Sequence, residues 1–149
     1  MGMTHREATI EDLDLLTEWN QHLITDESSA NPMTTAELRE RMHEWLFSDL
    51  YRVMIFTESE TDLAYALFAE SDTEVFLRQF FVHRDHRRQG HGRQVMNLLK
   101  SEIWPADKRL TVEVLVHNTA AYTFWRSTGY EAWTIRMSQE PDSQSTTTS

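Results

Sequence analysis

The sequence has 149 residues and contains no cysteine, which excludes disulfides, thiolate zinc sites and a cysteine nucleophile. It has no apolar stretch long enough to cross a membrane, and residues 1–6 lack the apolar segment of a signal peptide. Basic residues are scarce, 14 against 24 acidic ones, and the resulting net charge of −10 argues against general nucleic-acid binding. These absences predict a soluble cytoplasmic protein that binds neither membranes nor nucleic acids.

What is present is the composition of a globular protein, 40% hydrophobic and 26% charged. The length suits one domain with a substantial core, and we expect that domain to span residues 1–138. Residues 139–149 contain no aromatic or aliphatic side chain, so they are expected to form a disordered polar tail.

The spacing of apolar residues predicts an alternation of strands and helices. Two pairs that are typical of helix N-caps, Thr9 with Asp12 and Thr34 with Glu37, each precede apolar residues at helical spacing. Strands are expected over 4–9, 51–56, 63–69, 75–82, 110–117 and 130–137, and helices after Thr9, after Thr34, over 91–103 and over 118–128. The order β-α-α-β-β-β-α-β-α-β indicates a mixed α/β fold with a central mixed sheet.

Two of the four glycines lie close together in the segment Arg87-Arg88-Gln89-Gly90-His91-Gly92-Arg93, between the predicted strand 75–82 and the predicted helix 91–103. Glycine lets the backbone approach a ligand closely, and the unpaired N–H groups of a first helical turn point at an anion. Residues 83–93 hold four arginines and one aspartate, a local excess of three positive charges on an acidic chain. This turn predicts binding of a compact phosphorylated ligand.

Three motifs, in order, resemble those of GNAT-superfamily N-acetyltransferases. The strand end Phe80-Phe81-Val82 is followed by Arg87-x-x-Gly90-x-Gly92, which is similar to the family's acetyl-CoA signature. The strand Val112-Glu113-Val114 precedes Asn118-x-x-Ala121-x-x-Phe124-Trp125-x-x-x-Gly129-Tyr130, which is similar to the family's last motif. The motifs cover about residues 80–130, and the order of the predicted elements extends the resemblance over most of the chain.

The resemblance implies the GNAT acyl-CoA N-acyltransferase fold, with acetyl-CoA as co-substrate and direct attack of a primary amine on the thioester. It implies that the backbone of Phe81 and Val82 pairs with the pantetheine arm, and that Asn118 contacts the same arm. The pyrophosphate would be held by the backbone amides of Arg87, Arg88, Gln89, Gly90, His91, Gly92 and Arg93.

Glu113 is the expected general base, because it matches a glutamate that some members of the family are thought to use. The alternative is a surface or ion-paired glutamate. The family's usual acid, a tyrosine, is replaced by Trp125, whose indole supplies no usable acid. Tyr122, one turn earlier, is the expected substitute, and its alternative is a packed core residue. His117 is a candidate base or relay, or else a half-exposed loop histidine.

Gln79 stands where many relatives carry a carboxylate, and it could orient a water or the amine. His83, His86 and His91 fit no metal-binding pattern, so we expect no metal and instead contact with phosphate, or solvation. The acidic chain favours a cationic acceptor: a small amine, a polyamine, an aminoglycoside-like compound or a basic peptide terminus.

Two other functions remain open from the sequence. One is a CoA-binding protein without transferase activity, such as a sensor, which the missing tyrosine at Trp125 supports slightly. The other is a nucleic-acid-binding module that uses the arginine-rich turn, which the net charge disfavours. Because dimers are common in the family, a homodimer is an alternative to a monomer.

Overall fold

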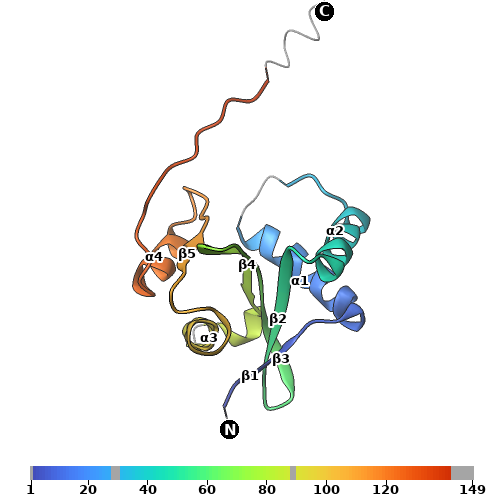
Figure 1. The fold of residues 1–149 in the computed structure, drawn as a ribbon. Coiled ribbons are helices and arrows are strands. Elements are labelled where there is room, and N and C mark those ends of the chain that lie inside the picture. The colour runs from blue at the N-terminus through green and yellow to red at the C-terminus, as the bar shows by residue number, and fades with distance from the viewer. Residues whose placement is uncertain (1, 28–30, 88–89, 142–149) are drawn as a thin grey trace, which may run out of the picture.

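The computed structural model describes residues 2–27, 31–87 and 90–141. Five strands form one mixed sheet in sequence order, as Figure 1 shows. The strands are β1 (Thr4–Glu7), β2 (Tyr51–Glu58), β3 (Thr61–Glu70), β4 (Glu74–Val82) and β5 (Arg109–Val112). Neighbours from β1 to β4 pair antiparallel, whereas β5 pairs parallel to the first half of β4. The mixed α/β fold that the sequence predicted is confirmed.

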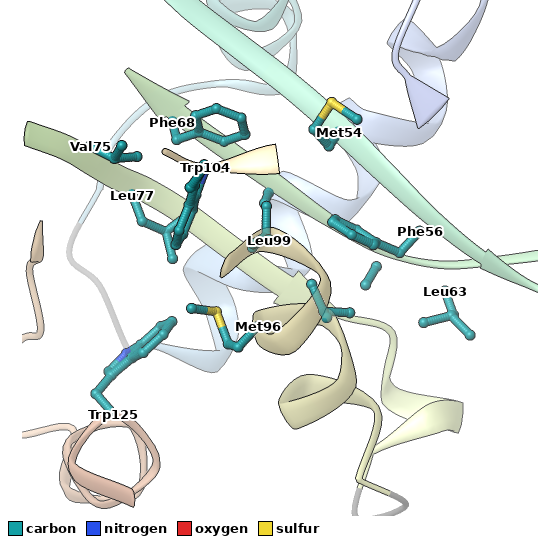
Figure 2. Close-up of a cluster of buried hydrophobic side chains, with 13 residues drawn as sticks. Met54, Phe56, Leu63, Phe68, Val75, Leu77, Met96, Leu99, Trp104 and Trp125 are labelled. Atoms are coloured by element: carbon teal, nitrogen blue, oxygen red, sulfur yellow. The ribbon is translucent and has the colours of Figure 1, made fainter. Parts of the chain in front are cut away.

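The helices cover both faces of this sheet. One apolar cluster joins α1 (Leu13–Asp26) and α2 (Thr35–Phe47) to side chains of β2, β3 and β4. A second cluster, drawn in Figure 2, joins the other face to α3 (His91–Leu98), to the π-helical turn η3 (Leu99–Ile103) and to α4 (Thr119–Ser127). Alternation along β2 separates the two clusters, since Val53 and Ile55 belong to the first and Met54 and Phe56 to the second.

The predicted start signals of the helices are present in the structure. Thr9 and Asp12 form a capping box at η1 (Ile10–Asp12), the single turn that leads into α1. Thr34 and Glu37 form a second capping box at the start of α2. The predicted helix over 91–103 is found as α3 followed by η3, and it ends before Pro105 as expected. None of the helices in the described ranges is long and apolar enough to cross a membrane.

A β-bulge interrupts the pairing of β3 with β4. Phe68 lies opposite Leu77 while its neighbour Leu67 lies opposite Gln79, so Arg78 is the extra residue on β4. The extra residue reverses the alternation of the strand beyond it. Leu77 and Phe80 therefore both join the cluster on the α3 side, although they are three positions apart and would face opposite sides of a regular strand.

The predictions for the last two strands were wrong in extent. The strand expected over 110–117 ends at Val112, and residues 130–137, where a final strand was expected, contain none. Trp133, Ile135 and Met137 alternate as in a strand, but all three are highly exposed. A strand needs a partner to satisfy its backbone groups, and alternation alone does not supply one. In the part of the chain that the structure describes, β5 pairs only with β4.

Candidate active site

The turn into α3 carries an uncapped helix N-terminus. Gly90 occupies the N-cap in the left-handed region, at φ 79° and ψ 6°, and makes no side-chain cap. The first bond of the helix runs from the Gln94 amide to the Gly90 carbonyl over 3.1 Å. The amides of the residues between them precede that bond, so they point out of the helix end without intrahelical acceptors. An anion is the ligand that such an end favours.

Gly92 lies against the ring of Phe124 on α4. A Cβ atom on Gly92 would lie 3.3 Å from Phe124 Cε1, closer than an ordinary van der Waals contact. Phe124 in turn stacks on Phe80 of β4, with ring centroids 5.9 Å apart and planes inclined by 12°. The absence of a side chain at Gly92 therefore lets α3, α4 and the end of β4 meet closely at this point.

The arginine side chains near this turn have protein partners. Arg87 donates to the Val82 carbonyl over 2.7 Å and to Asp26 over 2.6 Å, and Arg84 also pairs with Asp26, at 3.3 Å. Arg93 donates to the hydroxyl of Ser127 over 3.1 Å. Among the described arginines of this turn, Arg84, Arg87 and Arg93 are thus already engaged by the protein. The predicted contacts of Arg88 and Gln89 lie outside the described residues.

The predicted site histidine, His91, is buried and holds the turn in place. Its Nδ1 lies 2.9 Å from the His86 carbonyl oxygen, and its Nε2 lies 3.2 Å from Oε1 of Glu58 at the end of β2. The rings of His83, His86 and His91 follow one another with centroids 6.0 and 5.8 Å apart. Within the described ranges, they do not form a metal-binding group with other histidines or acidic residues.

A cavity of about 520 Å³ lies between α1, α2, the second half of β4 and the chain just after β5. It lies beside the point, at Leu77 and Val112, where the pairing of β4 with β5 ends. Glu113 is the first residue beyond β5 and lines the cavity together with Gln79, so the structure brings these two predicted residues to one site. The cavity is lined by Asn20, Leu23, Ile24, Glu27, Asn31, Arg41, Phe76, Arg78, Gln79, Glu113 and Arg136.

Gln79 is held by the buried Tyr65 of β3. The Tyr65 hydroxyl donates to Oε1 of Gln79 over 2.8 Å. Burial and the nearby Glu27 raise the pKa of Tyr65 far above its ordinary value, so the phenol keeps its proton. Because the amide oxygen of Gln79 is engaged, its NH₂ group is the part left to donate to a ligand in the cavity.

Glu27 is a second carboxylate of this cavity, and sequence reasoning missed it. Burial, and then the neighbouring charge of Asp26, raise the pKa of Glu27 above its ordinary value. Glu27 lies in the polar segment from Asp26 to Pro32, whose composition is typical of a helix break and indicates no site. No spacing in the sequence could have placed Glu27 near Glu113, because one follows α1 and the other follows β5.

The sequence profile of the acetyltransferase (GNAT) domain matches residues 49–132, more than half of the chain. The chain belongs to the GNAT acetyltransferase family. No curated protein matches it by sequence. The match extends from β2 to α4. It therefore includes the turn into α3 and the two cavity residues Gln79 and Glu113.

Solved GNAT structures share the fold at low sequence identity. A possible acetyltransferase from Clostridium difficile 630 superposes with a TM-score of 0.77 at 19% identity, covering 93% of this chain and 97% of its own. The aminoglycoside N-acetyltransferase AAC(6')-Iy in complex with CoA gives 0.75 at 14% identity, covering 95% of each chain. A predicted acetyltransferase from Clostridium acetobutylicum, solved with acetyl-CoA, gives 0.71 at 15%, covering 93% and 96%.

Other residues of the GNAT motifs have structural roles as well. Asn118 caps α4, its side-chain oxygen accepting from the Ala121 amide over 3.1 Å. Phe81 is buried against Trp19 of α1 at a centroid distance of 5.5 Å, and Val82 is half-buried at the end of β4. Both residues lie beyond Leu77, the last residue of β4 that pairs with β5, so this stretch of β4 has no strand neighbour on that side.

Trp125, at the GNAT tyrosine position, is a core residue here. It is buried and meets Phe80 edge to face, with centroids 5.5 Å apart. Tyr122 is about half exposed on α4, so it is not the packed core residue that was its alternative. It is not among the described residues that line the cavity. The structure thus brings Glu113, but not Tyr122, into the cavity.

Proposed function

We propose that this protein is an acetyl-CoA-dependent N-acetyltransferase that moves an acetyl group to the primary amine of a small molecule or peptide. One observation carries the proposal: an uncapped helix N-terminus follows the same strand, β4, that lines a cavity holding two carboxylates. The first feature suits a pyrophosphate and the second suits an amine that must lose a proton. The structures of relatives with CoA or acetyl-CoA support acetyl-CoA as the donor.

The residues present fit CoA. The backbone amides of the turn from Arg87 through Arg88, Gln89, Gly90, His91 and Gly92 to Arg93 would hold the pyrophosphate. The pantetheine arm would lie along the side of Phe81 and Val82 where β4 lacks a strand neighbour, near the start of α4 at Asn118. Acetyl-CoA supplies the acyl group as an activated thioester.

Within the cavity, the chain's own side chains would handle the amine and its proton. The amine nitrogen attacks the acyl carbon, so that a C–N bond forms and the C–S bond breaks. The proton of the resulting ammonium passes to the carboxylate of Glu113, directly or through a water, and the NH₂ group of Gln79 could donate to the oxygen of that water. Glu27 is the alternative acceptor of this proton, since its raised pKa suits a general base.

The leaving thiolate takes up a proton from Tyr122 or from solvent. A thiolate is a fair leaving group, so a dedicated acid is not essential. We further propose that residues 1–138 form the single domain of a cytoplasmic protein; most of the predicted tail, residues 142–149, lies outside the described residues. Light scattering on the purified protein would distinguish a monomer from a homodimer.

The test is thiol release from acetyl-CoA, measured with a panel of primary amines, together with calorimetric binding of CoA. Amine-dependent thiol release supports the proposed enzyme. Tight CoA binding without turnover on any amine favours the second candidate, a CoA-binding protein without transferase activity. The observation that favours this candidate is the buried Trp125 in place of a tyrosine.

A further inference from the structure

The cavity is basic although the protein is acidic. Three arginines line it, Arg41 of α2, Arg78 of β4 and Arg136, against the two carboxylates Glu27 and Glu113. The lining therefore carries one net positive charge, in a chain whose formal net charge is −10. A ligand entering the cavity meets a local charge opposite to that of the whole molecule.

Two of these arginines lie over one aromatic ring. The guanidinium carbon of Arg41 is 4.5 Å from the centroid of Trp45, and that of Arg78 is 5.2 Å from the same ring. Arg78 also donates to the Tyr51 hydroxyl over 3.3 Å, and a bound anion would offset the repulsion between the two guanidinium groups. Within the described ranges neither has a carboxylate partner, whereas Arg6, Arg39, Arg52, Arg84 and Arg87 each have one.

Donors of this group also lack acceptors. Asn20 is fully buried and accepts from Nη2 of Arg41 over 3.2 Å, but its own Nδ2 has no partner. Nε of Arg41 is likewise buried without a partner. Unsatisfied buried donors are rare in folded proteins, because each costs about 1–3 kcal/mol. Burial, and then the charge of Arg78, also lower the pKa of Arg41.

We infer that the acceptor is a small amine that carries a carboxylate, such as an α-amino acid, with its carboxylate bound by Arg41 and Arg78. Arginine binds a carboxylate through two parallel hydrogen bonds, and Asn20 adds a third donor. The amine end would then lie toward Glu113 and Glu27. The two glutamates of the lining suit the ammonium group at the other end of such a zwitterion. This inference rests on the proposed function, and it replaces the cationic acceptor that the overall charge favoured.

The experiment compares amines that differ only in the carboxylate: phenylalanine with phenethylamine, lysine with cadaverine, and β-alanine with ethylamine. We expect kcat/KM to be at least about tenfold higher for the carboxylated member of each pair. Arg78→Gln should remove most of this preference by lowering kcat/KM for the carboxylated amine alone. Arg39→Gln is the matched control, because Arg39 pairs with Asp14 and does not line the cavity.

Equal or faster turnover of the carboxylate-free amines would overturn the inference while leaving the acetyltransferase intact. A preference for phosphoethanolamine over β-alanine would likewise overturn it, in favour of a phosphate. If no amine is turned over, the proposed function fails, and the inference is tested by calorimetric binding of N-acetylphenylalanine. Binding that Arg78→Gln weakens at least about tenfold supports a carboxylate site, and absent or unaffected binding refutes it.

Discussion

His117 and Glu27 join two distant segments beside the cavity: the imidazole Nε2 of His117 lies 3.1 Å from the Glu27 carbonyl oxygen, across 90 positions in the sequence. A carbonyl only accepts, so Nε2 carries the proton in this contact. The contact ties the chain after β5 to the end of α1, and thus fixes two segments that supply Glu113 and Glu27 to the cavity. His117 is therefore better described as a positioning residue than as the base or relay considered from the sequence.

We predict that His117→Ala raises KM for the amine by about three- to tenfold, with a smaller effect on KM for acetyl-CoA, because one neutral hydrogen bond contributes about 0.5–1.5 kcal/mol. Steady-state kinetics with both substrates would measure the two effects. His117→Gln is the matched control, since its amide can donate to the same carbonyl. A loss in kcat alone, not restored by glutamine, would instead indicate a role in proton transfer.

Glu113→Gln should lower kcat by at least about tenfold and leave the Kd for CoA unchanged, because a proton acceptor is lost while shape is kept. Steady-state kinetics would measure kcat, and calorimetry on the same preparation would measure the Kd for CoA. Glu27→Gln is the companion variant. If Glu27→Gln lowers kcat and Glu113→Gln does not, the base is Glu27.

Tyr122→Phe tests the proton donor. If Tyr122 protonates the leaving thiolate, kcat should fall by about tenfold, because only the hydroxyl is removed. Folding should be unaffected at this half-exposed position. An unchanged kcat would mean that the thiolate is protonated by solvent.

Gly90→Val and Gly92→Val should each weaken CoA binding by at least about a hundredfold, for different reasons. At Gly90 the positive φ of 79° disfavours any side chain, at a cost of about 1–2 kcal/mol, and strains the helix start. At Gly92 a side chain would push on Phe124. Gly2→Val is the control, since nothing lies within 4 Å of its Cβ position. Calorimetry with CoA, alongside circular dichroism, separates binding from folding; wild-type affinity in either variant contradicts the pyrophosphate site.

The raised pKa of Glu27 predicts a pH-dependent stability. The Glu27 carboxyl binds its proton more tightly in the folded protein than in the unfolded chain, so protonation of Glu27 stabilises the fold. This contribution to the unfolding free energy is fully present below the ordinary pKa of 4.5, and it is lost as the pH rises through the folded-state pKa. The unfolding free energy of wild type should therefore fall relative to Glu27→Gln as the pH rises from about 4 to 7. Urea titrations at each pH measure this, with Glu44→Gln, exposed on α2, as the control. A constant difference would contradict the prediction.

Local signals predicted the fold well wherever they act within one element. The capping boxes at Thr9 and Thr34, the Asn118 cap and the glycine turn at Gly90 all follow from residues a few positions apart. The strand expected over 130–137 failed because pairing depends on a partner that alternation does not reveal. The sequence shows the alternation of a strand over 130–137 but not whether another strand pairs with it.

For the site, the sequence identified Glu113 and Gln79, because family motifs and strand positions mark them. It missed Glu27, Arg41 and Arg78, which the fold brings together from α1, α2 and β4. It also could not show that Asp26 pairs with Arg84 and Arg87 near the α3 turn, because Asp26 is 58 and 61 positions away from them in the sequence. The cationic acceptor that the net charge favoured stays a prediction, and the amine panel tests it against the carboxylated acceptor proposed above.

The bulge at Arg78 determines which side chains of β4 face each side of the sheet. Because of it, Arg78 and Gln79 both line the cavity, although adjacent residues of a regular strand face opposite sides. Deleting Arg78 would restore strict alternation and leave Gln79, Phe80 and Phe81 opposite their present β3 partners, so each core would keep its phenylalanine while the cavity lost an arginine. The extra residue thus lets β4 present two consecutive polar side chains to the cavity without disturbing the apolar packing on either face of the sheet.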